Sequence, residues 1–251
     1  MINFKLVNVS TGYFNGKSPA LVLARNVNDQ IQVATRIMLI GANGVGKSTF
    51  FKSICGLLRL VSGEIYFDSK RLDELSEREI ARTISMVTTT WPSNNMLTVH
   101  EILNLGRYPY SQMLGMMRDE DHLVVKKFSK IFNLCHLMDK SFNHLSDGQR
   151  QLVMISRGFI QTTPILILDE PFIHLDIGKK VWLKTLLKRL VQEEQKIIIF
   201  SHHDFPIDHD IADRAWFLSH DGSFQVCSGD DHSLIQQNIL KLFPEIITLQ
   251  E

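Results

Sequence analysis

A glycine-rich stretch, Gly41–Thr49, constrains the fold of this chain more than any other segment. It reads GANGVGKST, follows the apolar run Ile37–Ile40, and fits the pattern G-x-x-x-x-G-K-[S/T] of a phosphate-binding loop. The spacing has a physical reason. Glycines let consecutive backbone N–H groups point into one concavity, and the helix that follows presents its positive N-terminus there. The stretch therefore predicts a strand–loop–helix unit that holds phosphates, and the alternative is an ordinary glycine-rich turn.

Two side chains of this loop carry most of the predicted chemistry. Lys47 adds a full positive charge for the β- and γ-phosphates of a nucleotide, and the Ser48 hydroxyl is a candidate ligand of Mg²⁺. The predicted nucleotide-binding residues of the loop are Gly41, Asn43, Gly44, Gly46, Lys47, Ser48 and Thr49.

A second element, Ile165–Glu170, reads ILILDE and predicts a buried parallel strand that ends in two carboxylates. Asp169 would lie at the ligand edge of a sheet, where a carboxylate can hold Mg²⁺ through its water shell. Glu170 follows at once and can polarise a water for attack on a γ-phosphate. The alternative is an acidic pair that ends a strand at the surface.

Composition excludes several classes of protein. Among 251 residues, the 27 Lys and Arg balance the 27 Asp and Glu, which argues against a globally basic nucleic-acid binder. The three cysteines lie far apart without CxxC spacing, so we expect no disulfide and no zinc site, and a reducing compartment fits. The N-terminus lacks the apolar core of a signal peptide, and no apolar run approaches the roughly 20 residues that span a bilayer. A role at a membrane would therefore need a partner.

The order of predicted elements indicates an α/β core with an inserted helical lobe. Strands are expected at 3–10, 30–40, 64–68, 84–87, 165–168, 197–200, 215–218 and 224–227, with a loop at 11–18. Helices are expected at 50–58, 76–84, 99–107, 119–132, 147–160, 178–192 and 232–242. Because strands stop at 88 and resume at 165, we assign 1–88 and 164–251 to the core of one domain and about 89–163 to the lobe. Capping boxes at Thr98/Glu101 and Ser146/Gln149 mark two helix starts in the lobe.

Together these motifs resemble the ATP-binding subunit of ABC transporters over nearly the whole length of the chain. Gly41–Thr49 resembles the Walker A loop, and Ile165–Glu170 resembles Walker B with its catalytic glutamate. Leu145–Gln149, LSDGQ, is similar to the family signature, and Pro171–Asp176 to the D-loop. The resemblance implies a P-loop NTPase fold of the α/β class. Its sheet would be mixed, with N-terminal antiparallel strands and an inserted α-helical subdomain.

The resemblance also implies an ATPase mechanism with named residues. Lys47, Glu170 and His203 would be catalytic, with His203 as the switch histidine that contacts the γ-phosphate. Tyr13 would stack on adenine. In this family two copies sandwich two MgATP, so Ser146, Gly148 and Gln149 of one copy would bind the nucleotide held by the other.

Alternatives exist for two of these residues. His203 is otherwise a surface histidine, or part of a metal site with His202, Asp204 and His209. Tyr13 is otherwise a half-buried loop aromatic, with its neighbour Phe14 as the other candidate for stacking.

The chain departs from the family pattern at two positions. Thr89 stands where the family has a glutamine that ligates Mg²⁺, so the nucleotide would be coupled to the helical lobe through a shorter side chain. Asp147 replaces a signature glycine. Its charge suits a helix N-terminus but would repel a γ-phosphate, so we expect this side chain to point outward.

The segment Leu97–Tyr110, LTVHEILNLGRYPY, resembles ATPases of the importers that carry siderophores, haem or cobalamin. The resemblance implies a homodimer on the cytoplasmic face of the cell membrane, bound to transmembrane permease subunits and served indirectly by a substrate-binding protein. Met113, Met116 and Met117 would line the permease groove or belong to the lobe core. Two rival functions remain open, a soluble ABC-type ATPase not coupled to transport and a weakly hydrolysing nucleotide switch.

Overall fold

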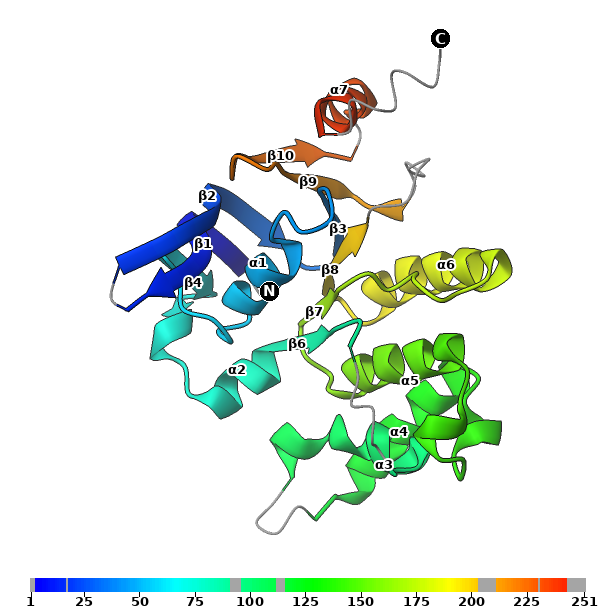
Figure 1. Cartoon of the computed structure of the whole chain (residues 1–251). Coiled ribbons are helices and arrows are strands. Elements are labelled where there is room, and N and C mark those ends of the chain that lie inside the picture. The colour runs from blue at the N-terminus through cyan, green and yellow to red at the C-terminus, as the bar shows by residue number, and fades with distance from the viewer. Residues whose placement is uncertain are drawn as a thin grey trace.

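Two β-sheets organise the chain in the computed structural model, which describes residues 3–16, 18–90, 96–111, 116–202, 211–229 and 231–242 (Figure 1). The first sheet is antiparallel, in the order β2-β1-β4-β5. Its strands are β1 (Asn3–Asn15), β2 (Ser18–Gln32), β4 (Ser62–Phe67) and β5 (Lys70–Arg71).

The second sheet has the order β10-β9-β3-β8-β7-β6 and is parallel except for β10, which pairs antiparallel with β9. Its strands are β3 (Thr35–Ile40), β6 (Ile84–Val87), β7 (Ile165–Leu168), β8 (Ile197–His202), β9 (Arg214–Leu218) and β10 (Phe224–Ser228). This mixed sheet with separate antiparallel N-terminal strands confirms the predicted fold class.

The helices fall into groups around the second sheet. Helix α1 (Lys47–Ile54) lies between the two sheets, and α3, α4 and α5 lie together beyond β6 and β7 (Figure 1). The other bounds are α2 (Glu77–Thr83), α3 (Val99–Leu105), α4 (Asp119–Ile131), α5 (Asp147–Ile160), α6 (Ile177–Glu193) and α7 (His232–Leu242). Short 3-10 turns occupy η1 (Leu72–Glu74), η2 (Tyr108–Tyr110), η4 (Cys135–Leu137) and η5 (Phe142–His144).

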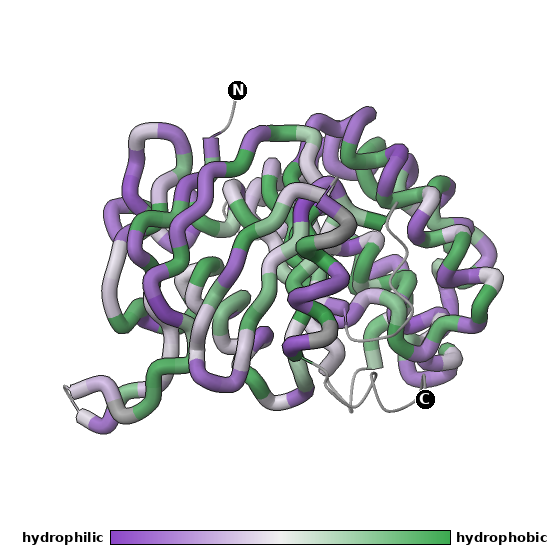
Figure 2. Tube along the Cα trace, turned by 90° about the horizontal axis from the view of Figure 1, so that it is seen from above, coloured by the Kyte–Doolittle hydropathy of each residue, from purple (hydrophilic) through white to green (hydrophobic). Residues whose placement is uncertain are grey.

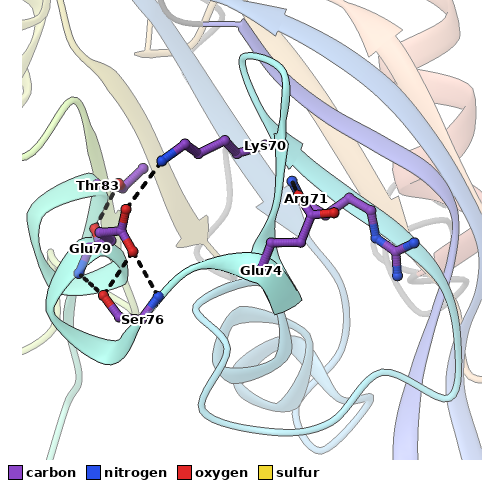
Figure 3. Close-up of polar contacts among 6 residues, drawn as sticks. All are labelled: Lys70, Arg71, Glu74, Ser76, Glu79 and Thr83. Carbon is purple, nitrogen blue, oxygen red and sulfur yellow. Dashed lines mark hydrogen bonds and ion pairs between the residues drawn. The ribbon is translucent and has the colours of Figure 1, made fainter.

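The capping boxes form as predicted. The hydroxyls of Thr98 and Ser146 accept from the backbone N–H groups of Glu101 and Gln149, respectively. In return, the side chains of Glu101 and Gln149 accept from the backbone N–H groups of Thr98 and Ser146. A third box starts α2, where Ser76 and Glu79 exchange hydrogen bonds and Lys70 of β5 reaches the Glu79 carboxylate at 3.2 Å (Figure 3). Each box satisfies N–H groups that a helix start otherwise leaves unpaired.

The expected loop at 11–18 is wrong, because β1 continues to Asn15 and pairs with β2. Tyr13 lies opposite Leu21 in this hairpin. Several register shifts interrupt the pairing and obscure its alternation in the sequence. Gly12 permits the close approach of the strands, since a Cβ there would lie 1.9 Å from the Leu21 carbonyl oxygen.

Strand β7 shows how the core divides into two layers. Ile165 and Ile167 pack into a cluster with α1 and the first sheet, whereas Leu166 and Leu168 pack into a cluster with α3, α4 and α5. All four side chains are fully buried, as predicted for a parallel strand covered on both faces. The helices carry hydrophilic and hydrophobic stretches in alternation along their length (Figure 2), as amphipathic helices do. Within the described parts of the chain, no helix combines the length and apolar character needed to cross a bilayer.

Candidate nucleotide site

The carboxyl ends of three neighbouring parallel strands bring the predicted site together. In the register of the sheet, Ile40 of β3 lies opposite His202 of β8, and Leu168 of β7 lies opposite Phe200 of β8. The phosphate loop and Asp169 therefore leave the same edge of the sheet, which is where ligands bind in folds of this type. His203 follows β8 but lies outside the described residues, as do Asp204 and His209.

The phosphate loop has the backbone that its glycines predict. Gly44 and Gly46 adopt φ of 76° and 115°, which are left-handed conformations that favour glycine. Gly41 passes close to β9, the neighbour of β3 in the sheet, since a Cβ on Gly41 would lie 2.7 Å from the Leu218 carbonyl oxygen. No side chain caps the start of α1. Its first N–H groups are thus available to an anion.

Lys47 is buried inside this loop. Its Nζ donates to the carbonyl oxygens of Gly41 at 2.7 Å and Ala42 at 3.0 Å. Burial lowers the pKa of Lys47, and the nearby carboxylates of Glu170 and Asp169 oppose that effect. The ammonium is therefore held at the loop by carbonyls that a bound phosphate can replace.

Ser48 and Asp169 meet at the predicted metal position. The Ser48 hydroxyl donates to Asp169 Oδ2 at 2.5 Å, and the carboxylate is only 5% exposed. Hydroxyl and carboxylate oxygens are the hard ligands that Mg²⁺ prefers, so this pair fits the ion chemically. Among the described hydrogen bonds, none joins Thr89 to Ser48 or Asp169. Thr89 is half-buried in the bend after β6.

Ser201 of β8 is a residue that the sequence reasoning missed. Its hydroxyl donates to Asp169 Oδ1 at 2.7 Å and accepts from the backbone N–H of Glu170 at 2.7 Å. Ser201 therefore fixes both carboxylate-bearing residues relative to β8. The available signal was a single hydroxyl in the otherwise apolar run IIIFSH of this strand.

Glu170 and Tyr13 complete the described site. Glu170 has a positive φ of 49°, a left-handed conformation that is uncommon for a non-glycine residue. The Tyr13 hydroxyl lies 2.9 Å from Thr49 Oγ1, and half of the Tyr13 side chain is exposed. Phe14 instead lies under the Arg59 guanidinium, and the distance from Arg59 Cζ to the centre of the Phe14 ring is 5.1 Å. Tyr13 is thus the aromatic that faces the phosphate loop.

The signature residues form a separate helix start. Within the described part of the chain, no hydrogen bond or ion pair joins Ser146, Gly148 or Gln149 to the phosphate loop. Asp147 points outward as predicted, because its side chain is 59% exposed and pairs with Arg150 at 3.1 Å. Gly148 packs against the D-loop segment, where a Cβ would lie 2.9 Å from the His174 carbonyl oxygen.

The remaining predicted residues are not gathered at the site. His202 is buried, and its ring lies edge-on to Phe172 at 5.9 Å. The described residues contain no group of three or more His, Cys, Asp or Glu that could hold a metal ion. Met116 is exposed, Met117 packs against the helical cluster, and Met113 lies outside the described residues.

Comparison with known proteins gives a consistent result. The family model for ABC transporters matches residues 24–173. The chain is 32% identical to the iron(3+)-hydroxamate import ATP-binding protein FhuC of Bacillus subtilis (strain 168), over 73% of this chain and 68% of that protein. It is 34% identical to the petrobactin import ATP-binding protein YclP of the same organism, over 78% of this chain and 75% of that protein. Its fold is also similar to the dimeric ATP-binding cassette MJ0796 bound to ADP and Pi, with a TM-score of 0.75, 26% identity, and coverage of 90% of this chain and 98% of that chain.

Proposed function

Since the chain belongs to the ABC transporter family and is an ATP-binding ATPase subunit of it, we propose that it powers the import of an iron chelate through separate permease subunits. The observation that carries the ATPase part is the contact of Ser48 with Asp169, beside Lys47 and Glu170. The names of the similar proteins support the import part, because FhuC and YclP are import ATP-binding proteins for an iron(3+) hydroxamate and for petrobactin.

The proposed catalytic site needs two copies of the chain. One copy would supply the phosphate loop, Asp169 and Glu170, and the other would supply the start of α5. Two observations support this division. Ser146 is exposed at the start of α5 and makes no polar contact with the phosphate loop among the described residues, and the similar cassette MJ0796 is a dimer. ATP would then join two half-sites, and its hydrolysis would weaken the contact.

Each residue has a role that follows from its chemistry. Lys47 would leave the two loop carbonyls to bind the β- and γ-phosphates, while Ser48 and Asp169 would hold Mg²⁺. Mg²⁺ held there would supply positive charge to offset the negative charge that develops on the phosphate oxygens. Glu170 would accept a proton from the attacking water. Tyr13 would stack on adenine, and we keep His203 as the residue that orients Glu170.

The proposed link to the permease runs through the helical lobe of residues 89–163. Arg107 of the LGRYPY motif is buried and bonds Asp121 at 2.7 Å and the Ile160 carbonyl at 2.9 Å. The Pro109 carbonyl accepts from Arg78 and Arg82 of α2. The motif thus ties the lobe to α2 and leaves Tyr108 72% exposed. We propose that the permease contacts the lobe at this motif, where Tyr108 is exposed, on the cytoplasmic side of the membrane.

Replacing Glu170 by glutamine tests the ATPase mechanism. We expect ATP binding to remain, hydrolysis to fall by about 10²-fold or more, and a closed dimer to accumulate in gel filtration. Glu77→Gln, a change at an exposed acid on α2, is the matched control. Hydrolysis at the wild-type rate in the Glu170 variant would refute the assignment of the base.

The import proposal has its own test. The chain would be purified together with the membrane protein that co-purifies with it, and the complex would be reconstituted in lipid vesicles. We expect ATP-dependent uptake of a ferric hydroxamate. ATPase activity without uptake of any iron chelate would instead favour an ATPase that is not coupled to transport. Absence of hydrolysis would favour the nucleotide switch, for which Thr89 is the supporting observation.

A further inference from the structure

A cavity of about 440 Å³ lies between the end of α4, the turn η4, the start of α5 and the first turns of α6. None of its lining residues is one that we place in the nucleotide site of the same copy, although Gln149 belongs to the signature, which would bind the nucleotide held by the other copy. The cavity therefore differs from the phosphate site described above.

The body of this cavity is apolar and aromatic. The side chains of Phe132 and Trp182 line it, with their ring centres 6.2 Å apart and their planes at 85°. Buried leucines from η4 and α5, including Leu137 and Leu152, also line it. Trp182 is 37% exposed, so part of its surface is accessible to a ligand. Such a wall favours a flat apolar ligand.

Lys179, Gln149 and Trp182 bring hydrogen-bond donors to this cavity, and Asn133 and His136 bring groups that can donate or accept. Lys179 lines the cavity, and among the described residues its ammonium pairs with Asp176, in an exposed i,i+3 ion pair of the kind that contributes little to stability. Among the described residues, no hydrogen bond uses the Trp182 indole N–H or the Gln149 amide nitrogen. The Gln149 side-chain oxygen is occupied by the Ser146 N–H.

The local charge agrees with these donors. No Asp or Glu lines the cavity. Helix α6 carries Lys179, Lys180, Lys184, Lys188 and Arg189 without any acid between Ile177 and Gln192, although the whole chain is neutral. A ligand with a negative charge is favoured here over a neutral or cationic one.

We propose that this cavity binds an aromatic carboxylic acid of one or two rings. The rings would lie against Trp182 and Phe132, and the carboxylate would accept from Lys179 and the Gln149 amide.

The proposed ligand would also act on the ATPase, a consequence that rests on the function proposed above. Gln149 ends the signature and caps the start of α5, which would meet the γ-phosphate held by the other copy. A carboxylate bound beside Gln149 places a second negative charge near that phosphate, so occupancy opposes closure of the dimer. The ligand is therefore expected to inhibit ATP hydrolysis.

Calorimetric titration of the nucleotide-free chain with 2-naphthoate tests the binding site. We expect one site per chain. The neutral 2-naphthamide and the cationic 2-naphthylmethylamine have the same ring system, and we expect both to bind at least tenfold more weakly. Trp182→Ala and Lys179→Glu are each expected to weaken 2-naphthoate binding at least tenfold. Lys188→Glu makes the same charge change on an exposed residue of α6 outside the cavity, and is expected to leave binding within about twofold, since exposed charges act weakly at a distance.

Three results would overturn the proposal. They are no saturable binding, equal binding of the three naphthalene probes, or wild-type affinity in both the Trp182 and the Lys179 variants. The Lys179 change is at the surface, so it keeps the test valid if Trp182→Ala destabilises the fold. Because binding is measured without nucleotide, the outcome of this test does not depend on the proposed ATPase function. Inhibition of hydrolysis by 2-naphthoate in the wild type, lost in Trp182→Ala, then tests the link to the signature.

Discussion

A buried ammonium, Lys196, makes the stability of this chain depend on pH in a way that can be calculated. Lys196 lies immediately before β8, is 4% exposed, and donates to the backbone carbonyl of Thr163. Burial lowers its pKa from 10.5 to about 8, with Glu194 opposing this effect and Lys127 adding to it. At about 1.4 kcal/mol for each pH unit between the two pKa values, the charged form costs the folded state about 3 kcal/mol.

The sign follows from proton binding. Below about pH 8 both states carry the proton and the whole cost is present. Between about pH 8 and 10.5 the unfolded state binds more protons than the folded state, so the free energy of unfolding gains up to about 3 kcal/mol relative to a chain without this group. Above 10.5 both states are neutral and the cost has disappeared.

We predict that Lys196→Met removes this pH dependence. Urea unfolding of both proteins at pH 7, 8, 9 and 10 gives the difference in unfolding free energy, in which the titrations of groups that do not interact with Lys196 cancel. Methionine leaves the Thr163 carbonyl without its donor, which costs about 1–3 kcal/mol at every pH. That loss shifts the difference by a constant and leaves its slope unchanged. A difference that stays flat from pH 7 to 10 would refute the reasoning about Lys196.

Three further substitutions test other parts of the structure. Gly46→Ala forces a Cβ into a left-handed position 2.9 Å from Leu23 Cβ. We expect it to abolish ATP binding in a nucleotide fluorescence assay and to destabilise the fold by about 1–3 kcal/mol, and binding at wild-type affinity would contradict the loop geometry. Arg107→Met removes the guanidinium that pairs with the buried Asp121 carboxylate and leaves it only the Arg118 backbone N–H among the described hydrogen bonds, so unfolding in urea is expected to show a loss of about 3–5 kcal/mol. A loss below 1 kcal/mol would count against the proposed role of Arg107 in holding the lobe together. Ser201→Ala removes the hydroxyl that joins Asp169 to the Glu170 backbone, and we expect kcat to fall at least tenfold while ATP binding remains, whereas unchanged kcat would make Ser201 a purely structural residue.

Local rules predicted the parts of the site that are built from consecutive residues. The phosphate loop depends on glycines at fixed offsets, the helix starts at Thr98 and Ser146 depend on a box of four residues, and β7 depends on an unbroken apolar run. Each is decided within a few residues, so periodicity and capping chemistry suffice. The outward position of Asp147 was predicted from the repulsion that its charge would exert on a nearby γ-phosphate.

Contacts between distant segments could not be predicted in this way. The hairpin through Tyr13 forms because β2 supplies a partner strand and Gly12 allows close approach, and neither follows from the alternation of residues 11–18. Ser201 joins Asp169 only through the register of β7 and β8. The cavity beside Trp182 exists because α6 returns to the end of α4, some 50 residues earlier in the chain. All three depend on tertiary packing.

The departure at Thr89 shows why that distinction matters for mechanism. A glutamine there would join the nucleotide to the helical lobe through its side chain, and threonine is shorter. The backbone offers a second connection, because the Asp169 N–H donates to the Val87 carbonyl at 2.8 Å, and a Cβ on Gly158 of α5 would lie 2.8 Å from a Val87 methyl. Val87 thus contacts both the predicted metal ligand and the signature helix, whatever side chain occupies position 89. A Val87→Ala change, which loosens this contact, is therefore expected to reduce ATP-driven dimerisation more than Thr89→Ala does, and the reverse order would assign the coupling to Thr89.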